Sequence, residues 1–320
     1  MANKLTDAIF HDEEAARAHY EALRWPDGRV CPHCGIVGDE FSTLLKGKSH
    51  RPGLYKCKVK ECRKPFSVTI GTLYERSHIP LHKWLLATHL MCSSKKGISA
   101  AQLHRNLGFG SYRTAWFMAH RIREAMRPED FEPSMGSGGG MVEADETFIG
   151  KDPDAHKNRM AIRNMCKVVA LVDRDSGRVR SYVVDNVSLK SIKPILEENL
   201  AREAHLMTDE ASHYKPLGKT YAKHSSVNHR QDEYVNREDN TIHTQTIEGY
   251  FGIFKRGMRG IYQHCDKKHL HRYLSEFDFR YSNRAALGID DTQRTAKAIK
   301  ATVGKRLLYE ATSGREAAQA

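Results

Sequence analysis

The sequence contains no apolar run long enough to span a bilayer. The N-terminal stretch from Met1 to Glu14 is too polar for a secretory signal peptide, and no internal repeat is present. These absences argue against a membrane-spanning protein and against a repeat array. We therefore expect a cytoplasmic protein, in which the seven cysteines are metal ligands or free thiols rather than disulfides.

Acidic residues are fewer than basic ones, 39 against 51, which gives a formal net charge of +12. An excess of Lys and Arg indicates a polyanionic partner, and nucleic acid is favoured over a membrane surface as that partner. The chain has 320 residues, enough for two or three domains. Its hydrophobic fraction of 40% allows a packed core.

The composition changes along the chain and predicts a multidomain α/β protein. Residues 28–72 are rich in Gly, Pro, Cys and Lys, which is typical of a small metal-stabilised module. The glycine-rich stretch 134–140 indicates a flexible linker. The expected parts are an N-terminal helix with the metal-stabilised module (1–76), a helical segment (77–130), a linker (131–141), an α/β domain (142–285) and a basic tail (286–320).

Beyond the linker, the apolar pattern has first the period of strands and then that of helices. The segment 173–177 (DRDSG) is a hairpin turn signal between two of the strands. This order predicts a mixed sheet with helices on its faces. The expected strands are 142–149, 168–172, 179–184, 205–208 and 223–229, and the expected helices are 188–200, 243–259 and 267–282.

Four cysteines lie in two closely spaced pairs. Cys31 and Cys34 form a C-x2-C knuckle, and Cys57 and Cys62 form a C-x4-C pair. Four thiolates from two turns can close a tetrahedral zinc site, and both spacings are within the usual range. The alternative is a group of unpaired buried thiols. The remaining cysteines are expected to be small core residues: Cys92, Cys166 and Cys265.

A short helix, a glycine turn and a basic helix follow the cysteine module. The first helix ends near Leu107, and Ser111 caps a second helix that runs to Met126. This order matches a helix-turn-helix, whose second helix enters the major groove of DNA. The alternative is a helical bundle with a solvated charged face. The polar side of the second helix would carry Arg113, His120, Arg121 and Arg123.

Three carboxylates stand where they could reach a buried site. Asp145 interrupts the apolar alternation of a strand, where an acid is costly unless it is paired or metal-bound. Asp209 comes at the end of a short strand, and Glu248 borders the buried stripe of a helix. For each acid alone, a surface or capping carboxylate is the simpler interpretation. Glu146 remains a second candidate beside Asp145.

Lys255 follows Glu248 by seven residues, close to two helical turns, and therefore lies on the same face of the helix. It is well placed to bind a phosphate near the carboxylates. Arg256 and Arg259 are further candidates for DNA contact. Three carboxylates can hold two divalent cations about 4 Å apart, and Mg2+ or Mn2+ suits such an all-oxygen site.

Taken together, these features resemble the bacterial insertion-sequence transposases of the ISXO-like group. These join a zinc ribbon to a DDE-type, RNase H-like catalytic domain. The resemblance covers about residues 10–285 and is most specific over 57–75, 142–150 and 243–262. It implies that the first Asp of the catalytic set is Asp145, the second Asp209, the third acid Glu248 and the following basic residue Lys255.

The resemblance also implies an activity. The expected protein binds the terminal inverted repeats of an insertion sequence and catalyses two-metal strand cleavage and strand transfer into target DNA. It would act as at least a dimer on double-stranded DNA in a bacterial cytoplasm, associated with the nucleoid when bound. The alternatives are an RNase H-like nuclease and a DNA-binding regulator with an inactive catalytic domain. Sequence assigns no role to His229, His243 or Gln245.

Overall fold

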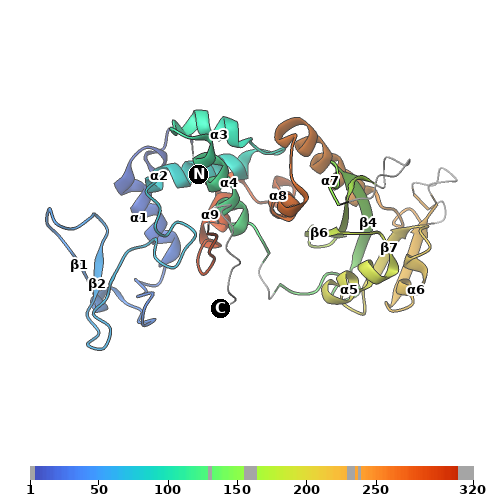
Figure 1. Cartoon of the computed structure of the whole chain (residues 1–320). Coiled ribbons are helices and arrows are strands. Elements are labelled where there is room, and N and C mark those ends of the chain that lie inside the picture. The colour runs from blue at the N-terminus through green and yellow to red at the C-terminus, as the bar shows by residue number, and fades with distance from the viewer. Residues whose placement is uncertain (1–3, 129–131, 155–163, 229–234, 237–238, 309–320) are drawn as a thin grey trace. The chain divides into compact units, whose positions relative to one another are not determined.

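The computed structural model describes residues 4–128, 132–154, 164–228, 235–236 and 239–308 (Figure 1). The chain divides into two compact units. We call them the N-terminal unit (Leu5–Ala87, Ala100–Ala125 and Ala298–Ala320) and the α/β unit (Met1–Lys4, Thr88–Ser99 and Met126–Lys297). No helix in the described ranges is long and apolar enough to cross a membrane.

The N-terminal unit combines helices with a small sheet. Helix α1 (Glu13–Arg24) begins at Asp12, whose side chain accepts a hydrogen bond from the N–H of Ala15 at 2.7 Å. Strands β1 (Ser42–Leu44), β2 (Tyr55–Cys57) and β3 (Pro65–Phe66) form an antiparallel sheet. The other elements are η1 (Ala8–Phe10), η2 (Asp39–Phe41), the first part of α2 (Leu81–Ser93), α3 (Ala100–Leu107) and α4 (Tyr112–Ala125).

The α/β unit is built on a five-stranded sheet of order β6-β5-β4-β7-β8. Strands β6, β5 and β4 pair antiparallel, whereas β4-β7 and β7-β8 are parallel. The expected mixed sheet is confirmed, and β4 lies at its centre. The strands are β4 (Met141–Ile149), β5 (Cys166–Asp173), β6 (Val179–Val184), β7 (His205–Asp209) and β8 (Lys223–Val227).

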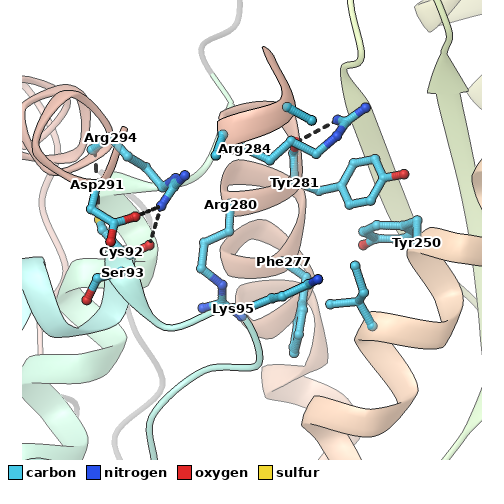
Figure 2. A pocket seen from close by; sticks show the side chains of 13 residues that line it. Cys92, Ser93, Lys95, Tyr250, Phe277, Arg280, Tyr281, Arg284, Asp291 and Arg294 are labelled. Carbon is cyan, nitrogen blue, oxygen red and sulfur yellow. Dashed lines mark hydrogen bonds and ion pairs between the residues drawn. The ribbon is translucent and has the colours of Figure 1, made fainter. Parts of the chain in front are cut away.

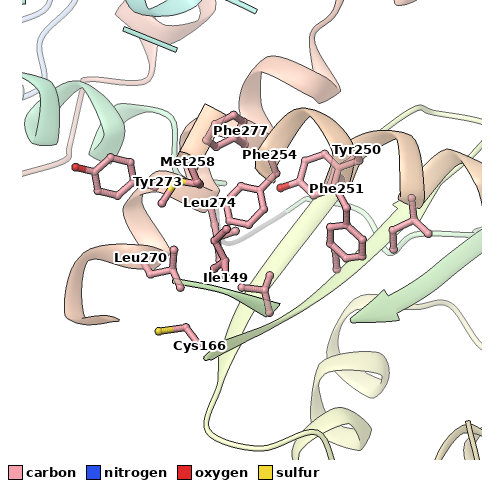
Figure 3. Packing of buried hydrophobic residues seen from close by; sticks show 14 of the residues in the cluster. Ile149, Cys166, Tyr250, Phe251, Phe254, Met258, Leu270, Tyr273, Leu274 and Phe277 are labelled. Atoms are coloured by element: carbon pink, nitrogen blue, oxygen red, sulfur yellow. The ribbon is translucent and has the colours of Figure 1, made fainter. Parts of the chain in front are cut away.

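Helices cover both faces of this sheet. Successive residues of β5 point to opposite faces, so alternate residues contact the helices of each face. Val168, Ala170 and Val172 pack with α7 (Gln245–Gly257) and α8 (Lys267–Ser282). Figure 3 shows this cluster, in which aromatic side chains of α7 lie above the strands. Val169 and Leu171 pack with α5 (Leu189–Asn199) and α6 (Tyr214–Gly218) on the other face. The remaining elements are η5 (Met258–Tyr262), η6 (Ala285–Leu287) and α9 (Asp291–Lys300).

Two segments are more ordered than their composition suggests. Met135, within the expected linker, is fully buried, and its N–H donates to the carbonyl of Asn199 at 2.8 Å. Gly136 has a φ of +72°, and a Cβ there would lie 2.5 Å from that of Ala204. The glycines therefore allow a tight turn packed on the sheet rather than a flexible tether. Within the expected tail, α9 is a helix that buries Ile299.

Candidate metal centre and candidate active site

The four predicted cysteine ligands converge in the N-terminal unit. Their Sγ atoms all lie within 4.8 Å of one another. The Sγ atoms of Cys31 and Cys62 are 3.8 Å apart, and those of Cys34 and Cys57 are 3.7 Å apart. A tetrahedral site with zinc–sulfur bonds of about 2.3 Å has edges of about 3.8 Å. The geometry therefore fits a single Zn2+ ion.

Local structure explains this convergence. The carbonyl of Cys31 accepts from the N–H of Gly35, which closes the first knuckle, and Cys57 ends β2. Burial raises the pKa of the Cys57 thiol to about 12, an effect that a bound cation would reverse. His33 stands outside the cluster, with its Nε2 atom 3.1 Å from the carbonyl oxygen of Pro65.

Strand register brings two of the predicted acids together in the α/β unit. In the parallel pair of β4 and β7, Glu143 is opposite Met207. Asp145 and Asp209 each lie two residues further along, so they occupy neighbouring positions at one end of the pair. Glu248 lies in the first turn of α7, the helix that covers this face of β4. Two sheet strands and one helix thus present the three acids.

The pKa of Asp145 reflects both its buried position and its acidic neighbours. Burial raises the pKa of Asp145 to about 8, and the charges of Glu146, Asp209 and Glu248 raise it further. Among the described residues, however, only the four cysteines gather tightly enough to form a complete ligand group. The three acids share an all-oxygen, mutually repelling environment, which fits divalent cations such as Mg2+ or Mn2+.

Glu146 has a different role from the neighbouring Asp145. Its side chain points to the opposite face of the sheet, where Oε1 accepts from the Tyr214 hydroxyl at 2.5 Å. The same oxygen lies 3.0 Å from Nε2 of His213, and this contact raises the pKa of His213. Glu146 therefore anchors α6 to the sheet, and Asp145 is the acid on the α7 face.

Sequence reasoning missed a buried acid that fixes the start of α7. Glu143 is fully buried and shares the α7 face of β4 with Asp145. One of its carboxylate oxygens accepts from the Ile247 N–H at 2.8 Å, and the other from Nε of Arg174 at 2.5 Å. A buried carboxylate requires such partners. Glu143 and Asp145 are two residues apart on one strand, and this spacing was the sequence signal that Glu143 shares the face of Asp145. Nothing in the sequence identified Arg174 as the ion-pair partner of Glu143.

Arg174 extends this contact to the segment that leads into α7. It follows β5, in the turn before β6, and donates to the carbonyls of Thr241 at 2.5 Å and His243 at 2.6 Å. A further donation reaches Nδ1 of His243 at 2.8 Å. We call Glu143, Arg174 and His243 the α7 anchor, because together they tie the start of α7 to the central strand.

The α7 anchor also defines the protonation of His243. Its Nδ1 accepts from Arg174 and, at 3.3 Å, from the N–H of Gln245, so the ring proton is on Nε2. Burial and the charge of Arg174 lower the pKa of His243. Nδ1 also lies 3.4 Å from Glu143, but an ion pair there would require a protonated ring. His229 lies outside the described residues.

Helix α4 differs from the sequence expectation. His120 and Arg123 are 0% and 2% exposed, so neither is available for DNA contact. The guanidinium of Arg121 lies 5.2 Å from the ring centroid of Trp84 and donates to the carbonyl of Glu75 at 3.1 Å. His120 and Arg123 are buried because the buried residues of α4 extend over more than half of its circumference. Of the four residues of this helix that were expected to contact DNA, Arg113, at the start of α4, is the exposed one.

Basic residues near the end of α7 are more accessible. Arg256, near the end of α7, and Arg259, in η5, are exposed. Lys255 is half-buried one residue before Arg256. These positions are compatible with phosphate contact. The order of α3, a glycine turn and α4 is present as expected, and its use as a helix-turn-helix stays a prediction.

Comparison with known proteins identifies two domains. Residues 138–282 match the model of the ISXO2-like transposase domain, and residues 11–65 match that of the transposase zinc-ribbon domain. A relative described as an uncharacterized protein in transposable element ISH50, from Halobacterium salinarum, is 25% identical over 290 residues. The alignment covers 85% of this chain and 91% of that protein.

Among solved structures, a chain of the simian T-cell lymphotropic virus intasome in complex with PP2A regulatory subunit B56 gamma is similar. It shares 15% identity, with coverage of 55% of this chain and 67% of that chain. Its TM-score of 0.29 is too low to support a conclusion about fold. The two domain models together cover more than half of the sequence, and the chain therefore belongs to the ISXO2-like insertion-sequence transposases with an N-terminal zinc ribbon.

Proposed function

We propose that this transposase is catalytically active and that Asp145, Asp209 and Glu248 form its reaction centre. The observation that carries the proposal is the register of β4 and β7, in which Asp145 lies beside Asp209, with Glu248 in the first turn of the helix that covers the same face. The carboxyl group of Asp145 lies in the central strand of the sheet, and burial together with neighbouring acids raises its pKa to about 8. Carboxylates that repel one another in a buried position indicate a site made for cations.

The three carboxylates are the residues that would hold divalent cations. When bound, a pair of such cations supplies Lewis acidity to the attacking water or 3′-hydroxyl and to the leaving oxygen. The chain itself holds the acids in register through β4 and β7 and fixes Glu248 through the α7 anchor. Lys255, Arg256 and Arg259 would bind DNA phosphates beside the acids.

Element ends would be recognised by the N-terminal unit. The cysteine cluster would hold Zn2+ and stabilise the small β1-β2-β3 sheet, and α3 with α4 would contact the terminal inverted repeats. Arg113 is the exposed cation from which we expect a contact to DNA. Joining two element ends to a target requires at least two active sites, so we propose a dimer or larger assembly on double-stranded DNA.

A joining assay tests the proposed activity. A pre-cut terminal-repeat duplex is incubated with a supercoiled target plasmid, the protein and Mg2+, and joined products are counted. Asp145→Asn should abolish joining, whereas the matched control Glu198→Gln, at an exposed position of α5, should retain it. Mg2+-dependent hydrolysis without joining would instead support a nuclease. Repeat-specific DNA binding without either reaction would support a regulator.

A further inference from the structure

A cavity in the α/β unit is not part of the acidic site. Its volume is about 480 Å³, and residues from the end of α2, from α7, from α8 and from the start of α9 line it (Figure 2). None of the three acids of the proposed reaction centre belongs to its lining. A volume in this range is typical of pockets that bind small molecules.

The cavity wall is rich in positive charge. Lys95, Arg280, Arg284 and Arg294 all line it, against one carboxylate, that of Asp291. Asp291 pairs with Arg294 at 2.6 Å, and Arg280 pairs with Glu276 of α8. Lys95 and Arg284 have no carboxylate partner within the described part of the chain. Their uncompensated charges favour an anionic occupant.

Arg280 is a buried part of the cavity wall. It is 6% exposed, and its guanidinium stacks on the Phe277 ring at 4.7 Å. Its Nη1 atom donates a hydrogen bond to the carboxylate of Glu276. The buried Nε and Nη2 atoms make no hydrogen bond to any described residue. Buried donors without partners are rare because each loses its hydration. Because both atoms are fully buried, they do not open into the cavity, and contacts to an occupant fall to the more accessible Lys95 and Arg284.

Aromatic rings complete the cavity. Tyr250 and Tyr281 are arranged edge to face, with centroids 5.3 Å apart, and the guanidinium of Arg284 lies 4.1 Å from the Tyr281 centroid. Figure 2 shows Tyr281 between Arg284 and Phe277. Aromatic side chains beside cations are the combination that binds single nucleotides, because the rings stack on bases and the cations bind phosphate.

We propose that this cavity binds one nucleoside monophosphate group, either a free nucleotide or an unpaired nucleotide of a DNA strand. The choice of a nucleotide over another phosphate ester rests on the proposed function, because only that function brings DNA to the protein. The site itself requires neither the three acids nor divalent cations.

Calorimetric titration of the full zinc-bound chain with dAMP, in buffer without Mg2+ or Mn2+, tests this site. Lys95→Ala removes a cation of the lining, and Lys96→Ala is the matched control at a neighbouring exposed lysine that does not line the cavity. Ala286→Trp fills the cavity from an exposed position, and Ala8→Trp controls for adding an exposed indole elsewhere. Inorganic phosphate and deoxyadenosine are titrated in parallel.

We expect saturable binding of dAMP, weaker binding of phosphate and none of deoxyadenosine. Lys95→Ala should weaken dAMP binding by roughly tenfold, as expected for one charge-assisted contact. Ala286→Trp should abolish binding, and both controls should bind normally. No binding to the wild type, equal affinity for phosphate and dAMP, or equal losses in Lys95→Ala and Lys96→Ala would each overturn the proposal.

Competition identifies the source of the nucleotide. Displacement of dAMP by a duplex with one unpaired end nucleotide, but not by its blunt form, would assign the site to DNA. Displacement by neither duplex would assign it to a free nucleotide, and equal displacement by both would contradict a single-nucleotide site. Because these titrations contain no Mg2+ or Mn2+, their outcome is independent of the joining assay, and either proposal can fail alone.

Discussion

The charged form of Asp145 is disfavoured in the protein without bound cations. Its pKa of about 8 means that the carboxyl group is largely protonated at neutral pH in the absence of cations. Burial is the main cause, and the charges of Glu146, Asp209 and Glu248 contribute. Cation binding at this residue must therefore displace a proton.

The affinity for Mn2+ should consequently depend on pH. Below the pKa of Asp145, each fall of one pH unit should weaken binding by about tenfold, because protons compete for the carboxylate. Affinity should level off above about pH 8. Calorimetric titration with Mn2+ from pH 6 to pH 9 measures this. Asp145→Asn should remove the dependence, and a pH-independent wild type would contradict the raised pKa.

Single residues also mark where sequence reasoning succeeds and fails. Spacing alone identified Cys31 and its partners, because a tetrahedral thiolate site imposes a local pattern. The choice of Asp145 among the acids needed the family resemblance. His120 and Arg123 were wrong as DNA contacts, since a polar residue on a helix gives no sign of being buried by distant segments. Glu143 was missed because its partner Arg174 is 31 residues away.

Helix α7 is the element whose position decides the geometry of the acids. Its first turn carries Glu248, and its N-terminus is capped by Glu143 from another element. The sequence predicted this helix and the strands of the mixed sheet well, because their apolar periods are regular. It could not predict the cap, since a long-range hydrogen bond leaves no local pattern.

Loss of the α7 anchor should impair activity without removing a cation ligand. Arg174→Lys keeps the positive charge but loses the branched guanidinium group. That group donates hydrogen bonds to Glu143, Thr241 and His243 at the same time. We expect joining to fall by about 10–100-fold, as for other groups that orient metal ligands. The Mn2+ concentration for half-maximal activity should rise, which a purely structural loss would not cause.

Arg178→Lys is the matched control, because Arg178 lies after the same turn but contacts Pro133 and Ser134 rather than the α7 segment. It should leave the Mn2+ requirement unchanged. Glu143→Gln should resemble Arg174→Lys, since the amide can still accept from Ile247 but no longer pairs with the guanidinium. An unchanged Mn2+ requirement in both anchor variants would exclude a positioning role.

The whole molecule consists of two units that should respond separately to metal removal. The N-terminal unit contains the cysteine cluster, whereas the α/β unit has its own buried clusters on both faces of the sheet. A small three-stranded sheet has little core, so zinc should supply much of its stability. The division differs from the predicted domains, since residues 88–99 belong to the α/β unit.

Cys31→Ser should release zinc and weaken binding to terminal-repeat DNA. The α/β unit should keep its fold, because none of its buried clusters contains a cysteine ligand. Zinc stoichiometry, DNA affinity and the circular dichroism of the variant measure the three effects. Cys92→Ser, at a buried cysteine outside the cluster, controls for the loss of a thiol. Full zinc occupancy in Cys31→Ser would refute the four-cysteine site.

The turn between β5 and β6 has a consequence for how this family can vary. Hairpin turns normally tolerate insertions and deletions, because they are exposed and make few contacts. Here the turn presents Arg174 to the start of α7, and Asp173 accepts from the N–H groups of Asp175 and Ser176. A scan of single-residue insertions should therefore find this short hairpin as intolerant as the strands beside it, because a change in its length would displace Arg174 from the start of α7.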